Sequence, residues 1–235
     1  MKLIGIDGCR SGWLVATSGD ARLTLSFEIV ADLASFLNDL DESNARVVID
    51  VPIGLPPDGA RACDLEARRY LGKPRNSSVF PAPCRATLAA RTYQDACDLN
   101  SQASGKKVSR QMFHILDKIR NIDSFVTRDR QGWFREAHPE LIFAVLGGNE
   151  RGLTHSKKTP EGEHERLAIL EAYVPAFDVR AVRVQLGLAA AARDDIIDAV
   201  ACLVTARRLV NGDAMVLPVG PAPLDARGLR MEMVA

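Results

Sequence analysis

The chain contains 235 residues, of which 47% are hydrophobic and 26% charged, and its 30 Lys and Arg residues balance 30 Asp and Glu residues. These values are typical of one globular domain, exclude a disordered chain, and give no overall attraction to nucleic acid or to an acidic membrane surface. No apolar run is long enough for a signal peptide or a membrane span, and cysteines without a CxxC pair favour reduced thiols in a cytoplasm.

Residues 3–30 are predicted to form three strands that follow one another as hairpins. The apolar run 3–7 ends at Asp7, and residues 8–12 contain two glycines and form a turn. Residues 13–17 and 23–30 supply two further strands, the second with large apolar residues alternating with polar ones. Consecutive strands of this kind make an antiparallel meander.

A helix and a second buried strand are predicted after the meander. Residues 32–40 carry Leu and Phe at helical spacing, and residues 46–51 form a short apolar strand that Pro52 ends. Because a helix separates this strand from the meander, it is predicted to pair in parallel. The sheet is therefore mixed.

A helical insertion is predicted over residues 58–130, within a single domain that spans residues 1–235. A Pro-broken loop at 77–83 interrupts it, and residues 109–126 have the spacing of an amphipathic helix. Between Arg61 and Arg135, Lys and Arg outnumber Asp and Glu about two to one. This excess of positive charge is typical of a region that binds an anionic polymer. It is equally typical of a solvated helical surface whose charges are unevenly distributed.

The last third of the chain is predicted to be mainly helical. Residues 133–138 form a short strand, and Pro139 begins a helix that continues through Leu146. A polar loop with Lys157 and Lys158 leads into a helix over 163–173, and the last helix runs from Asp194 to Val210 before Asn-Gly. The predicted fold class is α/β, with helices flanking the mixed sheet.

Three groups of acidic residues are the candidate catalytic set. Asp7 and Asp50 end apolar strands, and Asp195 and Asp198 lie one turn apart in the last helix. Carboxylates in such surroundings are unfavourable unless a positive charge meets them. Oxygen ligands of this kind suit Mg²⁺ or Mn²⁺, so we predict that all four acids bind metal, with Asp194 as the helix cap.

Each acid also has a structural interpretation. An Asp before Gly commonly forms a turn, and Asp50 can cap the loop that follows it. Acids in a first helical turn interact favourably with the helix dipole, which does not account for Asp198. A salt bridge from Arg or Lys that closes the acidic set would argue against a metal site.

Five further residues are candidates for supporting roles. His138 and Glu140 lie in the segment EAHPE, where they can cap a helix or support the metal as a ligand or general base. Arg10, Lys157 and Lys158 are predicted to contact phosphate, or else belong to solvated turns.

Several motifs occur along the chain in a specific order: IDGCRSGW, IDVPIGLP, NSSVFPAPCR, DKIRNID, HPE, SKKT and DDIIDA. In this order, from Gly5 to about Gly228, the chain resembles the uncharacterised DUF429 family, whose members are described as predicted ribonuclease H-like nucleases. The resemblance implies a ribonuclease H-like fold. It also implies that Asp7, Asp50 and either Asp195 or Asp198 hold catalytic metal.

The predicted function is metal-dependent hydrolysis of phosphodiester bonds in nucleic acid. One alternative is a nucleotide-binding phosphotransferase or ATPase of the actin-like superfamily, although the chain shows neither a duplicated fold nor a second glycine-rich phosphate loop. A third is a nucleic-acid-binding protein without catalytic activity. The sequence leaves the type of nucleic acid and the oligomeric state open.

Overall fold

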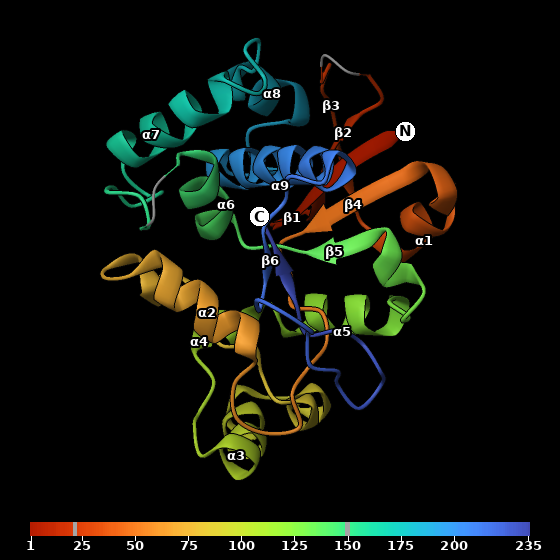
Figure 1. Cartoon of the computed structure of the whole chain (residues 1–235), viewed down its shortest axis with the longest axis vertical. Coiled ribbons are helices and arrows are strands. Elements are labelled where there is room, and N and C mark those ends of the chain that lie inside the picture. Colours follow the sequence, from red (N-terminus) through yellow and green to blue (C-terminus); the bar gives the residue numbers. More distant parts are fainter. Residues whose placement is uncertain (21–22, 149–150) are drawn as a thin grey trace.

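A five-stranded mixed sheet forms the centre of the computed structural model, which describes residues 1–20, 23–148 and 151–235. The strands lie in the order β3-β2-β1-β4-β5, antiparallel from β3 to β1 and parallel from β1 to β5. Figure 1 shows the sheet with helices on both sides. The predicted mixed α/β fold is confirmed and is consistent with a ribonuclease H-like arrangement. The strands are β1 Lys2–Cys9, β2 Gly12–Ser18, β3 Ser26–Val30, β4 Ala45–Ile49 and β5 Phe134–Glu136.

The helices divide between the two faces of the sheet. Buried residues of α2 and α6 to α9 form one hydrophobic core, whereas α1 and α3 to α5 contribute to a second core on the opposite face. A small sheet of β6 and β7 lies near the C-terminus. The bounds are α1 Leu33–Asn38, α2 Ala62–Leu71, α3 Tyr93–Ser104, α4 Arg110–His114, α5 Leu116–Phe125, α6 Pro139–Leu146, α7 Pro160–Glu171, α8 Val179–Leu186, α9 Arg193–Asn211, β6 Val216–Leu217 and β7 Met233–Val234.

Helix α9 lies directly on β1, with its neighbours β2 and β4 also in contact (Figure 1). Successive side chains of β1 point to opposite faces, so Ile4 and Ile6 enter one core while Leu3 enters the core of α9. Gly5 lies on the α9 face. A Cβ atom on Gly5 would lie 2.0 Å from the carbonyl oxygen of Ala199, so the helix approaches the strand as closely as its backbone permits.

Gly5→Ala is expected to lower the free energy of unfolding by about 2 kcal/mol, because the added methyl overlaps the backbone of α9. The urea unfolding midpoint measures this change. Gly19→Ala is the matched control, since an added Cβ there meets nothing within 4 Å. Equal stability of the two variants would contradict the close packing of α9 on β1.

Several predicted boundaries are wrong. Strand β1 continues past Asp7 to Cys9, because these residues pair with β2. The predicted strand 23–30 begins only at Ser26, since Leu23 has a positive φ of 52° that an extended strand does not allow. The predicted helix 109–126 is divided at Ile115, whose φ of −98° and ψ of 2° leave the helical region. Helix α8 and the small sheet of β6 and β7 were not predicted.

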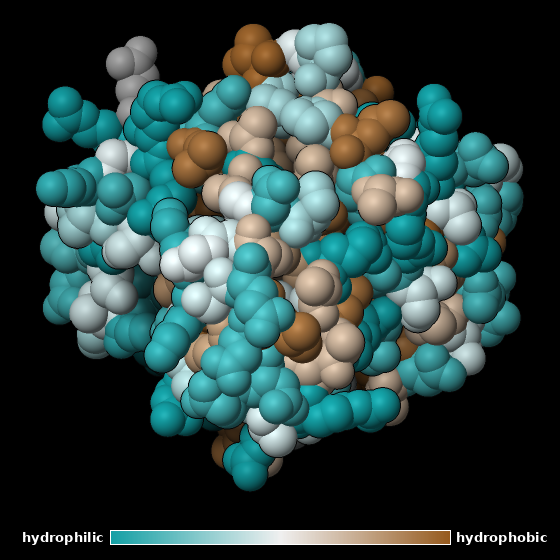
Figure 2. Space-filling view, turned by 90° about the horizontal axis from the view of Figure 1, so that it is seen from below, coloured by the Kyte–Doolittle hydropathy of each residue, from teal (hydrophilic) through white to brown (hydrophobic). Residues whose placement is uncertain are grey.

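The surface is largely hydrophilic. From the viewpoint of Figure 2, hydrophilic residues cover most of the visible face, and hydrophobic residues lie among them in small groups. Within the described ranges, no helix combines the length and the apolar character that crossing a bilayer requires.

Candidate functional site

Asp7 and Asp50 lie side by side at the end of two neighbouring parallel strands. The register pairs Ile6 of β1 with Ile49 of β4, and Asp50 N donates a hydrogen bond to Ile6 O at 3.0 Å. Each Asp follows its paired residue directly. Because side chains alternate along a strand, Asp7 lies on the same face as Gly5, which is the face that α9 covers.

Asp198 of α9 is the third acid of this site. Its side chain is almost completely buried, with 1% of its surface exposed, and Asp7 is 8% exposed. Burial raises the pKa of Asp7 well above its usual value, and the charges of Asp50 and Asp198 raise it further. Asp50 and Asp198 thus lie near enough to Asp7 for their charges to raise its pKa, and the binding of a metal by these three residues stays a prediction.

The other two members of this trio are also harder to ionise than usual. Burial raises the pKa of Asp50 to about 7, while Lys157 acts in the opposite direction. Burial likewise raises the pKa of Asp198, although Lys157 lies next to it and lowers it. Ionising all three carboxyl groups at once is therefore unfavourable unless a positive charge compensates them.

Lys157 supplies the positive charge closest to these acids. Its Nζ lies 2.5 Å from Asp198 Oδ2. Burial disfavours the ammonium group, yet the carboxylates of Asp198 and Asp7 together raise the Lys157 pKa above its usual value. This contact is a salt bridge of the kind that argues against a metal at Asp198. Lys157 contacts a carboxylate in this structure, and its contact with phosphate stays a prediction.

The donor chemistry of the site fits a divalent cation better than its geometry does. Asp198 Oδ1 is buried without a hydrogen-bond partner, which leaves an oxygen available to a ligand. In the described part of the chain, however, no group of three or more His, Cys, Asp or Glu side chains is placed to hold a metal ion. A cation therefore requires the acids to move closer together and Lys157 to move away from Asp198.

The first turn of α9 has a different capping arrangement from the predicted one. Asp194 was expected to cap the helix, but Ala192 is the capping residue and Asp195 Oδ2 accepts a hydrogen bond from Ala192 N at 2.8 Å. Asp194 instead pairs with Lys158 Nζ. Asp195 is thus engaged at the helix start, and Asp198 is the helix acid directed to Asp7 and Asp50.

His138 is a helix cap. Its Nδ1 accepts a hydrogen bond from Glu140 N at 3.3 Å, and its Nε2 lies 3.2 Å from Ser78 O. Burial lowers the pKa of His138, and the Lys157 charge lowers it further. A neutral ring that donates to Ser78 O fits both contacts. His138 therefore fixes the start of α6 next to the acids.

Glu140 is held by a buried ion pair. Its Oε1 lies 2.6 Å from Arg166 Nη2, and Arg166 also donates to the carbonyl oxygens of His155 and Gly162. These carbonyls flank the loop that carries Lys157. Glu140 thus supports the site by anchoring this loop, while its role toward a metal stays a prediction.

A second buried network holds the loop after β4. Arg61 Nη2 lies 2.6 Å from both Asp64 Oδ1 and Glu136 Oε1, and Glu136 Oε2 accepts a hydrogen bond from Ile53 N. Burial raises the pKa of Glu136 to about 7, and Arg61 opposes that shift. The network links α2 and β5 to the segment that follows Asp50.

The charge excess of the insertion is partly structural. Arg61, Arg85, Arg120 and Arg130 all form ion pairs within the protein. Arg10, predicted to contact phosphate, lies exposed in the turn between β1 and β2 and lines neither cavity described below.

A cavity of about 350 Å³ opens beside Asp7 and Asp50, and we call it the acidic cavity. It lies at the carboxyl ends of parallel strands, where α/β proteins commonly bind ligands. The helical insertion contributes Phe80, Met112 and Lys118 to its wall. Sequence reasoning missed these residues. Lys118 had one visible signal, a charge at the border of the apolar face of a predicted helix.

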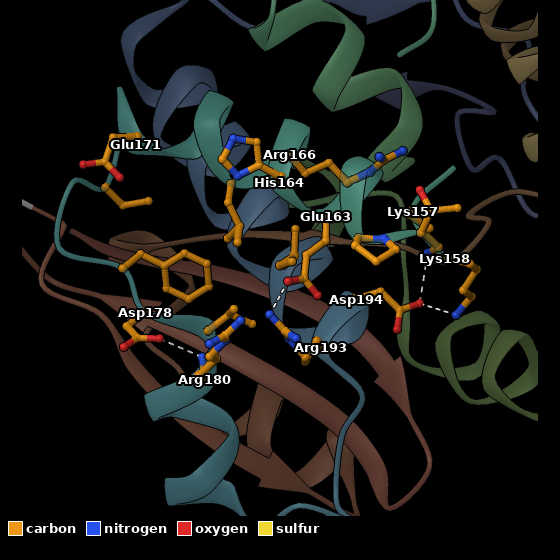
Figure 3. A pocket seen from close by; sticks show the side chains of 17 residues that line it. Lys157, Lys158, Glu163, His164, Arg166, Glu171, Asp178, Arg180, Arg193 and Asp194 are labelled. Carbon is orange, nitrogen blue, oxygen red and sulfur yellow. Dashed lines mark hydrogen bonds and ion pairs between the residues drawn. The ribbon is translucent and has the colours of Figure 1, made fainter. Parts of the chain in front are cut away.

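A larger cavity of about 850 Å³ lies between α7, α8 and the start of α9, and we call it the helical cavity. Figure 3 shows Lys158 directed to Asp194 and Arg193 directed to Glu163 across it. Lys157 and Lys158 line both cavities. The helical cavity contains Asp194 but not Asp7 or Asp50, so the acidic cavity is the candidate functional site.

The chain was compared with known families and proteins. The sequence model described as "Protein of unknown function (DUF429)" matches residues 5–222. Because this match covers most of the chain, the chain belongs to that family, and the predicted family is confirmed. No curated protein and no solved structure matches the chain.

Proposed function

We propose that this DUF429 protein is a metal-dependent hydrolase of phosphodiester bonds in nucleic acid, acting at the acidic cavity. The observation that carries the proposal is that Asp7 and Asp50 lie side by side where the parallel pairing of β1 and β4 ends, with the buried Asp198 close enough for its charge to raise the pKa of both. Mutual repulsion of this kind is unfavourable in the free protein, and a divalent cation removes it. The cysteines in the described ranges are unbonded, which supports a cytoplasmic location.

Asp7, Asp50 and Asp198 would hold Mg²⁺ or Mn²⁺, with Asp195 as a fourth candidate at the helix start. When bound, the cation would lower the pKa of a water molecule and stabilise charge on the phosphate. The protein's own cations have a separate role. Lys118 and Lys158 line the acidic cavity and are placed to attract a phosphate to the acids.

Lys157 has to change partner for a cation to be held by Asp198. In the free protein its ammonium group neutralises Asp198 at 2.5 Å. If a cation takes over this neutralising role, Lys157 becomes available to the phosphate. Metal binding and phosphate binding should therefore support each other. This exchange explains why a lysine lies beside acids that are proposed to bind a cation, although the lysine and the cation are both positively charged.

The rate of hydrolysis is expected to rise with pH up to about pH 7 and to level off above it. Ionised carboxylates are needed to hold a cation, and the pKa of Asp50 is raised to about 7. Below that pH, protons compete with the metal. A pH–rate profile at fixed, subsaturating Mn²⁺ measures this dependence, and Mn²⁺ well above its dissociation constant should shift the rise to lower pH. A profile independent of pH between 5 and 8 would contradict this role of Asp50.

Hydrolysis of labelled single-stranded, duplex and branched nucleic acids tests the proposal directly. We expect cleavage with Mg²⁺ or Mn²⁺, none with EDTA, and none in Asp7→Asn. Binding without cleavage under every metal condition would favour a nucleic-acid-binding protein. ATP turnover without cleavage of nucleic acid would favour a phosphotransferase or ATPase instead.

A further inference from the structure

The acidic cavity has an apolar wall as well as a charged one. Phe80, Met112 and Ile115 of the insertion line it opposite the strand ends that carry Asp7 and Asp50. A site that only holds ions needs no such wall. A ligand with both an apolar flat part and an anionic part matches the two kinds of wall.

We propose that the acidic cavity binds one unpaired nucleoside monophosphate unit, either free or at the end of a single strand, with its base on Phe80. This inference rests on the proposed function, since it names the substrate class of the same site. It excludes a base-paired duplex as the species that enters.

Phe80 is suited to receive a base. The residue is 38% exposed although it borders the cavity, and in the described part of the chain no aromatic ring stacks on it. An exposed aromatic ring in a cavity wall offers apolar surface that a ligand can cover. Every nucleobase offers a flat face for stacking on such a ring.

Lys118 is held in position for the phosphate. Its Nζ donates to Gly12 O at 2.5 Å and lies 4.3 Å from the centre of the Trp13 ring. The side chain also passes close to Gly8, the residue after Asp7. Because side chains alternate along β1, Lys118 approaches from the face opposite to Asp7 and borders the same cavity. Lys158, at 71% exposure, provides a second cation at the rim.

The size of the cavity limits what can enter. Its volume of about 350 Å³ is near the lower end of the range for small-ligand pockets. A base within a duplex can reach such a pocket only after it leaves the stack. An unpaired terminal nucleotide needs no such step. The rest of a strand can continue past Lys158 into the helical cavity, because this lysine lines both spaces.

Isothermal titration calorimetry in EDTA tests the proposal without turnover. The probes are adenosine 5′-monophosphate, a short single-stranded oligonucleotide and the same sequence in a blunt duplex. We expect the monophosphate and the single strand to bind and the duplex to bind at least tenfold more weakly. Tighter binding of the oligonucleotide than of the monophosphate identifies a strand end as the ligand, and equal binding identifies the free nucleotide.

Phe80→Ala is expected to weaken binding of the monophosphate about tenfold or more, the usual effect of removing a stacking platform. Phe36→Ala, a partly buried phenylalanine of α1 far from the cavity, is the control and should bind as the unchanged protein does. Thermal melting of both variants confirms folding. Unchanged affinity in a folded Phe80→Ala protein, or duplex binding equal to single-strand binding, would overturn the proposal.

The outcome separates this inference from the proposed function. Phe80-dependent binding of the monophosphate without any metal-dependent cleavage would leave the nucleotide site in place and refute the hydrolase. Cleavage of duplex as fast as of single strand would support the hydrolase and refute the nucleotide site.

Discussion

Asp7→Asn is expected to lower the rate of phosphodiester hydrolysis about a thousandfold or more, and to make the folded protein more stable above pH 7. The loss of activity follows from removing the central carboxylate of the site. The gain in stability follows from removing a buried acid whose ionised form is unfavourable, because burial and the charges of Asp50 and Asp198 all raise the pKa of Asp7. An Asn retains the shape of the side chain and an oxygen for the hydrogen bond from Gly8 N.

The sign of the stability change depends on pH. Asp7 has a raised pKa in the folded state, so between its ordinary value near 3.8 and the raised value the folded protein binds more protons than the unfolded chain. Stability then falls as pH rises through this interval. Asn does not titrate, and its advantage should be about 1 kcal/mol or more at pH 8 and absent near pH 3.

Urea unfolding at pH 8 and pH 3, together with the cleavage assay, measures both effects. Asp213→Asn, an exposed acid just after α9, is the matched control and should change neither quantity. Full activity in a folded Asp7→Asn protein would remove the acidic cavity as the catalytic site. Lower stability of that variant at pH 8 would show that other groups already neutralise the negative charge of Asp7 in the protein without metal.

Asp198→Asn is expected to have the opposite effect on stability, lowering the free energy of unfolding by about 3 kcal/mol. Asp198 is buried and is the closest partner of Lys157, so its neutral replacement leaves a partly buried ammonium group with only the longer contact of 4.0 Å to Asp194 Oδ2. The expected cost lies at the lower end of the range for buried pairs, because the Lys157 side chain is 31% exposed and can reach water.

A double-mutant cycle isolates this pair. Lys157→Met combined with Asp198→Asn is expected to recover part of the stability that Asp198→Asn loses, since neither member of this ion pair then carries a charge, although Asp7 and Asp50 lose the Lys157 charge as well. Urea unfolding of the four proteins gives the coupling energy. Strictly additive effects would mean that the Lys157–Asp198 contact contributes nothing in solution, and the site would then be open to a cation without an exchange of partners.

Local pattern predicted much of the fold and part of the site. The apolar runs ending at Asp7 and Asp50 specified two strands, and the intervening helix specified their parallel pairing. Parallel pairing in register places both acids at one edge. The spacing of Asp195 and Asp198 placed them one turn apart. These features depend on residues that are close in sequence. Within such a short segment, the local backbone geometry sets the direction of each side chain.

Other features depend on contacts between distant segments. Lys157 reaches Asp198 across 41 positions, and no local spacing distinguishes that pair from a solvated lysine. Lys118 and Phe80 come to the acids from the insertion, through the packing of α4 and α5 on the sheet.

The sequence by itself determined the parallel pairing of the strands that carry Asp7 and precede Asp50, and with it the place of both acids at one edge of that pairing. Only the tertiary structure decided which cation neutralises them and which apolar wall encloses them. The physical reason is that side-chain direction along a strand or helix follows from local backbone geometry, whereas an ion pair or a cavity wall depends on how separate elements pack.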